Sequence, residues 1–238
     1  MNRKYVRSRI QEIGIIPSVR VSSAQDARFA AENIFQGGIP IVEIGMAVLG
    51  AIHLISDLAK NSPDVIVGAG GIMDGETARR CIEAGANFLT TDGLIPEVVA
   101  FASMAEIVVF PGALTPTEVI AAWRAGSDFV KVVPCSAVGG KDYFKALKTA
   151  LPDIQLIAAG GVNQQTAADY LEAGAMALGV GEALIPPDAI EHRQSKRIHE
   201  LARRFLKFVN IGRLKNGSKI HEAVVDRTQN LHLEKITT

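Results

Sequence analysis

The stretch Ala69-Gly70-Gly71-Ile72, which leads to Glu83-Ala84-Gly85-Ala86, returns later in the chain as Ala159-Gly160-Gly161-Val162 and Glu172-Ala173-Gly174-Ala175. In each copy a Gly pair follows a short apolar run, and a single glycine ends a segment of helical period. The repeated unit is therefore a strand, a turn and a helix. Units of this kind build parallel α/β folds.

Outward from these two copies, short apolar runs alternate with helical stretches almost to the C-terminus. We predict strands at 14–20, 39–45, 64–69, 87–91, 107–110, 128–133, 154–159 and 175–180. We predict helices at 24–36, 48–60, 74–84, 94–103, 116–124, 140–150, 164–172 and 195–209. This alternation indicates a closed α/β barrel of the (β/α)8 (TIM) type, forming a single domain over residues 1–210.

The C-terminal segment 211–238 is polar and carries a turn signal at Asn216-Gly217-Ser218. We assign it no chemistry, and interpret it as either a subunit contact or a partly disordered tail.

The composition favours a small-molecule substrate. Lys and Arg together number 25, as do Asp and Glu, which leaves no basic excess for binding nucleic acid. No apolar run approaches the roughly 20 residues of a membrane span and the N-terminal stretch has no hydrophobic signal core, so we expect a cytoplasmic protein without a membrane partner. Cys81 and Cys135 have neither metal-ligand nor disulfide spacing and are expected to be reduced and buried.

Two charged residues stand inside predicted strands. In the run Asp128 to Pro134, alternation places Lys131 on one face with Phe129 and Val133, and the opposite face, carrying Val130 and Val132, suits packing under helices. Lys131 therefore points into the barrel. Partial desolvation there favours its neutral amine, which is the form that attacks a carbonyl. A neutralised buried lysine, or one reaching solvent at a strand end, is the structural alternative.

Glu43 points inward by the same alternation within Ile41 to Gly45. It falls on the second predicted strand and Lys131 on the sixth, and side chains of alternate strands share interior layers in such barrels. When a lysine amine attacks a carbonyl to form a Schiff base, a neighbouring group must donate and accept protons. None of the five histidines lies at a predicted strand end. Glu43 is thus the candidate general acid/base, with a role as counter-ion of Lys131 as the alternative.

These residues belong to a pattern that resembles the 2-keto-3-deoxy-6-phosphogluconate and 4-hydroxy-2-oxoglutarate aldolases over about residues 10–190. The matching motifs are Ile16-Pro17-Ser18-Val19-Arg20, Gly37-Gly38 through Val42-Glu43-Ile44, Val67-Gly68-Ala69-Gly70, Phe110-Pro111-Gly112, Phe129-Val130-Lys131 with Pro134, and Gly160-Gly161-Val162.

The resemblance implies a class I aldolase that makes or breaks a carbon–carbon bond to pyruvate, with no cofactor and no metal. It implies that Lys131 is the Schiff-base lysine, Glu43 the general acid/base, and Arg20 a group that faces substrate anions. It also implies a homotrimer. The predicted substrate-binding residues are Arg20, Gly70, Gly71, Thr91, Asp92, Pro111, Gly160, Gly161, Gly181 and Glu182, with Gly160-Gly161 as the phosphate-binding turn.

Four departures from the family pattern concern substrate binding. Gly45 and Ala47 replace a threonine and an arginine after Glu43, which removes a carboxylate clamp whose arginine alone would be worth about 1.5–3 kcal/mol. Gly71 stands in place of a threonine and Asp92 in place of a proline, both beside the substrate carboxylate in the family. Glu182 replaces a phosphate-binding serine and would repel a phosphate. We therefore expect a divergent member with an altered substrate.

Two other functions compete with this one. Glu43, Asp92 and Glu182 all lie at or near C-terminal strand ends and could together bind Mg²⁺ or Mn²⁺ in a metal-dependent lyase or isomerase. Alternatively, the missing clamp indicates a barrel that binds a keto acid or phosphate ester without turnover. Formation of a covalent imine distinguishes these possibilities.

Overall fold

The computed structural model describes residues 1–234, with side chains up to residue 217, and it confirms the predicted parallel barrel. The strands are β1 (Ile15–Val19), β2 (Ile41–Gly45), β3 (Ile66–Gly70), β4 (Phe88–Thr90), β5 (Val108–Phe110), β6 (Gly112–Ala113), β7 (Val130–Val132), β8 (Leu156–Ala158) and β9 (Ala177–Val180). Every predicted strand overlaps an observed one.

The observed strands number one more than predicted because the fifth barrel strand is divided at Pro111. The sheet order β5-β4-β3-β2-β1-β9-β8-β7-β6 places its two parts at the two ends of the sheet. Proline has no N–H to donate, so the strand ladder is interrupted there. The Pro111 carbonyl still accepts from Lys131 N–H at 2.9 Å, and Ala113 O accepts from Val133 N–H at 3.1 Å. These bonds hold the second part against β7, while β5 pairs with β4, and Pro111 joins the two parts covalently, so the sheet closes into a ring.

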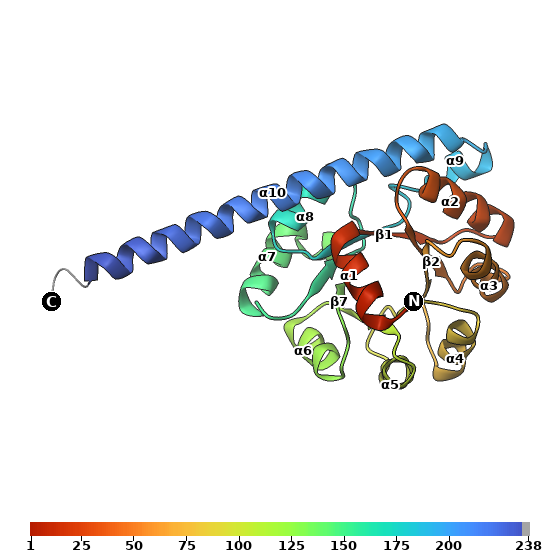
Figure 1. Cartoon of the computed structure of the whole chain (residues 1–238), viewed down its shortest axis with the longest axis horizontal. Coiled ribbons are helices and arrows are strands. Elements are labelled where there is room, and N and C mark those ends of the chain that lie inside the picture. The colour runs from red at the N-terminus through yellow and green to blue at the C-terminus, as the bar shows by residue number, and fades with distance from the viewer. Residues whose placement is uncertain (235–238) are drawn as a thin grey trace.

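Helices surround the ring, as Figure 1 shows. They are α2 (Ala24–Gln36), α3 (Ala51–Asn61), α4 (Gly75–Glu83), α5 (Pro96–Met104), α6 (Pro116–Arg124), α7 (Gly140–Ala150), α8 (Ala167–Glu172), α9 (Pro187–Glu191) and α10 (Ser195–Glu234), with a 3-10 turn η1 (Cys135–Val138). Side-chain caps on the preceding residue fix several starts; Thr115 and Glu118, for example, form a capping box at α6. The short α9 was not predicted.

The N-terminal helix α1 (Arg3–Ile13) was also missed by the sequence analysis. It begins at the Asn2 cap, whose side chain accepts from Tyr5 N–H, and its apolar face buries Val6 and Ile10. It contacts β1, β5 and β9 and lies across the end of the barrel that faces the viewer in Figure 1. This helix covers the end of the barrel at which the strands begin.

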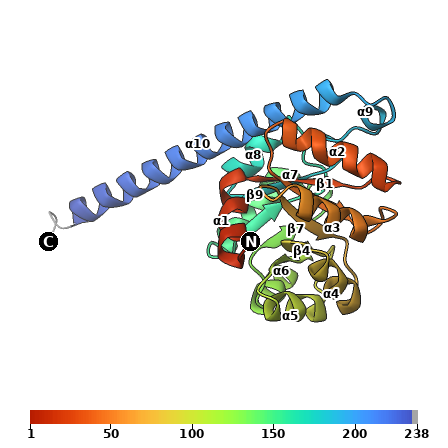
Figure 2. The same cartoon turned by 45° about the vertical axis from the view of Figure 1, so that its right-hand side comes forward.

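Helix α10 extends to Glu234, so the predicted end at residue 209 and the turn at 216–218 are both wrong. Ile198, Ala202, Phe205 and Val209 bury one face of its first half, as the helical period predicts. Figure 2 shows the second half extending beyond the barrel. No helix of the described chain is long and apolar enough to cross a membrane.

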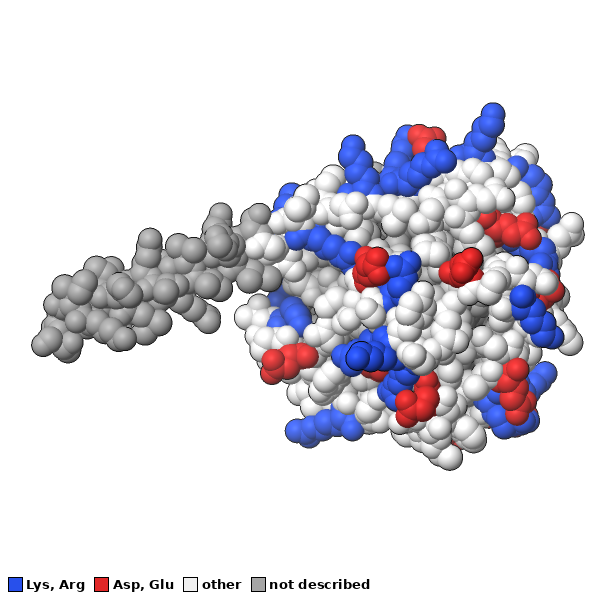
Figure 3. All heavy atoms as spheres, in the orientation of Figure 1, with Lys and Arg blue, Asp and Glu red and all other residues white. Residues whose placement is uncertain are grey.

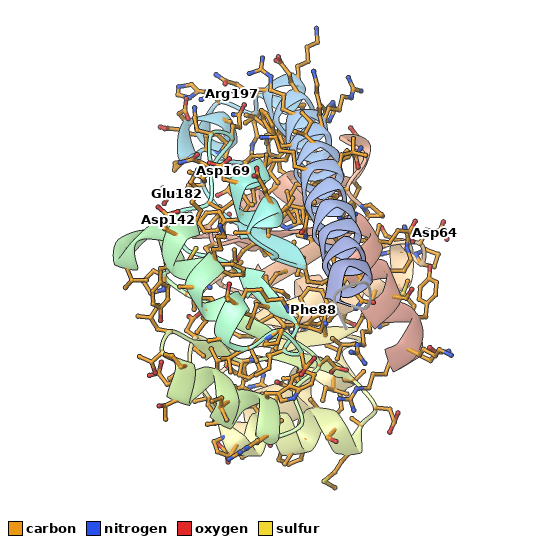
Figure 4. The ribbon with its side chains drawn as sticks, turned by 90° about the vertical axis from the view of Figure 1, so that its left-hand side faces the viewer. Asp64, Phe88, Asp142, Asp169, Glu182 and Arg197 are labelled. Carbon is orange, nitrogen blue, oxygen red and sulfur yellow. The ribbon has the colours of Figure 1, made fainter. Side chains whose placement is uncertain are left out.

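Charged side chains of both signs are spread over the face of the molecule drawn in Figure 3. Figure 3 shows Lys and Arg interspersed with Asp and Glu on the side that carries α1. The two ends of the barrel are distinguished in Figure 4, where Asp64, from the loop before β3, lies on one side of the molecule and Asp142 and Glu182 lie on the other. The latter side carries the C-terminal strand ends, where (β/α)8 barrels place their sites.

Candidate active site

A cavity of about 620 Å³ opens at the C-terminal ends of the strands. The predicted site residues that line it are Arg20, Glu43, Asp92, Lys131, Gly160, Gly161, Gly181 and Glu182. Apolar side chains, among them Ile16, Phe110 and Ile157, form much of its remaining wall. A concave site with a few convergent charges is the usual form of a small-molecule pocket.

Lys131 projects from the middle of β7 into this cavity, as the strand alternation predicted. The residue is buried, and its Nζ lies 2.9 Å from Asp92 Oδ1 in an ion pair. Asp92 belongs to the loop after β4, so the contact spans the divided fifth barrel strand, which lies between β4 and β7. The counter-ion of Lys131 in the described chain is therefore Asp92.

Glu43 lies in the middle of β2 and is 3% exposed. Its carboxylate accepts hydrogen bonds from Ser18 Oγ at 2.6 Å and from Thr90 Oγ1 at 2.9 Å, one on each oxygen. Gly70 leaves the room for it, because a Cβ at that position would lie 2.3 Å from Glu43 Oε1. A carboxylate has about four lone-pair sites, so Glu43 is held in place and can still exchange a proton with a bound molecule.

Arg20, just beyond β1, lies close to both carboxylates, Asp92 and Glu43. Its Nη2 lies 3.4 Å from Asp92 Oδ1 and 3.9 Å from Glu43 Oε1, while its side chain remains half exposed at the mouth. Partial burial acts to raise the pKa of Asp92, but the Lys131 ammonium and the Arg20 guanidinium outweigh it and hold the pKa of this carboxyl below its ordinary value. Asp92 therefore stays ionised between two cations.

The opposite wall of the cavity carries the predicted phosphate-binding turn. Gly160 and Gly161 follow β8 with φ of 76° and 90°, and a Cβ on Gly161 would meet the Ser136 side chain. Within the described residues, neither N–H donates a recorded hydrogen bond. Glu182 follows β9 and is exposed at the same mouth, on the side where Figure 4 labels it. The turn thus offers N–H donors to an anion, whereas the negative charge of Glu182 would repel an anion.

Four predicted substrate-binding residues do not line the cavity. Gly70 lies against Glu43, Thr91 is buried, Pro111 divides the fifth barrel strand, and Gly71 has a positive φ with open space where a Cβ would stand. Any contact of these residues with substrate remains a prediction.

Sequence reasoning missed Ser18 and Thr90 as site residues, although both stand in predicted strands, 14–20 and 87–91. Each contributes a hydroxyl to Glu43. Ser18 pairs with Glu43 in the register of β1 and β2, and this register could have indicated their proximity. Asn163, after β8, also lines the cavity and was not predicted to belong to the site.

The two cysteines behave as predicted. Both are free and buried, and burial raises the pKa of the Cys81 thiol to about 11. Among the residues whose side chains are described, no group of three or more His, Cys, Asp or Glu is arranged to hold a metal ion.

Comparisons with known proteins agree with this geometry. The family model "KDPG and KHG aldolase" matches residues 6–201. A 2-dehydro-3-deoxy-phosphogluconate aldolase of Pseudomonas aeruginosa is 28% identical over 196 residues, which cover 82% of this chain and 89% of that enzyme. A KHG/KDPG aldolase of Escherichia coli K12 is 28% identical over 189 residues, covering 79% and 89%.

A solved structure extends the comparison to chemistry. The KDPG aldolase of Legionella pneumophila, with pyruvate captured as a covalent carbinolamine intermediate, superposes with a TM-score of 0.77 at 26% identity. The alignment covers 83% of this chain and 96% of that one.

Proposed function

The chain belongs to the KDPG and KHG aldolase family, and from this premise we propose that Lys131 forms a Schiff base with a 2-keto-4-hydroxy acid that is cleaved to, or made from, pyruvate. The protein is a class I aldolase, a carbon–carbon lyase. The observation that carries the assignment of Lys131 is a buried lysine whose amine reaches a cavity shared with a second buried charge, Glu43.

In the proposed cleavage, the Lys131 ammonium gives up a proton, the resulting amine adds to the C2 carbonyl, and the carbinolamine loses water to give an iminium. Removal of the proton from the C4 hydroxyl breaks the C3–C4 bond, which releases the aldehyde and leaves an enamine on Lys131. Protonation of C3 and hydrolysis then release pyruvate. Glu43 is the group that moves these protons, because its carboxylate faces the cavity and the two hydroxyls fix its orientation.

The proposed mechanism needs no cofactor, since the covalent imine supplies the electron sink. We propose a non-phosphorylated or hydroxyl-bearing substrate, because Glu182 faces the mouth near Gly160-Gly161. We also propose a homotrimer located in the cytoplasm, with the barrel over residues 1–210 as its single domain and residues 211–238 as an appended segment.

Trapping tests the Schiff base directly. Incubation with pyruvate and borohydride should add one reduced pyruvate, located at Lys131 by peptide mapping. An unmodified Lys131 in protein that still cleaves substrate would refute the mechanism. A panel of phosphorylated and plain 2-keto-4-hydroxy acids, each tested for cleavage by measuring the pyruvate released, would then identify the substrate.

A further inference from the structure

The charges around the reacting amine cancel one another. Lys131 and Arg20 are the cations that line the cavity in the described chain, and Asp92 contacts both of them, at 2.9 Å and 3.4 Å. Glu43 supplies the second carboxylate of this group, 3.9 Å from Arg20. Two positive and two negative groups leave no surplus positive charge for a substrate anion. Glu182 makes the whole cavity acidic.

Covalent geometry brings a substrate anion to this same place. A 2-keto acid joins Lys131 Nζ through C2, and C2 carries the carboxylate, so the carboxylate carbon is two bonds from Nζ. Asp92 Oδ1 already contacts that Nζ. The two carboxylates are therefore neighbours that compete for Lys131 and Arg20, in a partly buried site where like charges repel strongly.

We propose that Asp92 occupies, at Lys131 and Arg20, the place that a 2-keto acid's carboxylate must take. In this way it lowers the affinity for 2-keto acids relative to neutral carbonyl compounds. The inference rests on the proposed Schiff-base function. Asp92 is a counter-ion in this role, because a carboxylate that contacts two cations is a poor proton acceptor. Its side chain is 48% exposed at the mouth, so it can turn outward when a keto acid binds. A neutral carbonyl compound needs no such displacement.

Two probes of the same skeleton test this. Pyruvate carries the carboxylate, and methyl pyruvate carries a neutral ester in its place. Each is titrated against the full-length protein with cyanoborohydride present, and adduct on Lys131 is measured by intact mass. Asp92→Asn, which keeps the size of the side chain and removes its charge, should lower the half-saturating pyruvate concentration at least ten-fold. The methyl pyruvate value should change by less than about three-fold.

The ratio of the half-saturating concentrations of pyruvate and methyl pyruvate separates a change in specificity from a change in the reactivity of Lys131. Any change in the reactivity of the Lys131 amine itself affects both probes alike and cancels in the ratio. The matched control is Glu182→Gln, which removes a charge from the same cavity with no recorded contact to Lys131 or Arg20. It should move the ratio less than Asp92→Asn does.

Several outcomes would overturn the inference. These are an unchanged ratio in Asp92→Asn, an equal gain for both probes, or an equal shift in Glu182→Gln. Asp92→Ser provides the same comparison if the asparagine variant does not fold by circular dichroism. Adduct formation by neither probe in the native protein would instead refute the Schiff-base function, and the inference with it.

Discussion

The inner end of the cavity and its mouth are built differently. At the inner end, Glu43 is buried on β2 and held by the hydroxyls of Ser18 on β1 and Thr90 on β4. At the mouth, Asp92 and Glu182 stand on loops, and the Asp92 side chain is half exposed and held by charge. Most of the departures that the resemblance predicts lie on the loops, and the residues predicted to carry the chemistry lie on the strands. We therefore expect the strands to preserve the chemistry and the loops to alter what is bound.

The largest expected effect comes from removing the amine at the inner end. Lys131→Met keeps a long side chain in the buried position and removes the nucleophile, so pyruvate release and borohydride trapping should both fall below detection. Lys141→Met is the matched control, because Lys141 pairs with Asp169 and does not line the cavity. Residual trapping elsewhere on a folded Lys131→Met variant, with turnover retained, would assign the chemistry to another lysine.

The next effect concerns the proton carrier. Glu43→Gln keeps the shape and can still bond both hydroxyls, but it has no titratable proton, so kcat should fall by about 10²–10⁴-fold. Ser18→Ala, which removes one of the groups that orient Glu43, should cost less. Near-native kcat in Glu43→Gln, measured by pyruvate release, would mean that Glu43 contributes packing and does not transfer protons.

The same contrast explains what the sequence could predict. Strand alternation placed Lys131 and Glu43 in one interior because backbone pleating fixes side-chain direction. The Asp92–Lys131 contact spans 39 residues through a loop, and no periodicity describes a loop. Glu43 was considered as the counter-ion because only the strands could be placed in advance.

The missed helix α1 has a different cause. Val6, Ile10 and Ile13 have helical spacing between the Asn2 cap and Gly14, whose φ is 72°. This pattern is present in the sequence, but it precedes the first strand and so lies outside the strand–helix repeat on which the predicted helices rest. Helix α10 was ended too early at the opposite boundary, because Gly217 suggested a turn and a lone glycine is tolerated in a helix.

A smaller effect is expected at the mouth. Glu182→Ser should shift the ratio of kcat/KM values toward a 6-phosphorylated substrate by about ten-fold, since a negative charge leaves the mouth that carries Gly160-Gly161. Solvent at this exposed position screens the charge and keeps the shift modest. The ratio is measured by pyruvate release from matched phosphorylated and plain substrates. A strong native preference for the phosphate ester would mean that Glu182 points away from the bound group.

The smallest expected effect separates the Schiff-base enzyme from a metal-dependent one. The metal hypothesis needs Glu43, Asp92 and Glu182 to act together, but two of these carboxylates are already engaged. Glu43 accepts from hydroxyls at the inner end, and Asp92 contacts two cations that would repel a third. Prolonged dialysis against EDTA should therefore leave kcat and KM within about two-fold of the untreated protein, with added Mg²⁺ or Mn²⁺ giving no gain. Lys131 trapping by pyruvate should be equally unaffected. Activity that disappears with the chelator and returns with either ion, while Lys131 remains unmodified, would mean that mouth and inner end form one metal site.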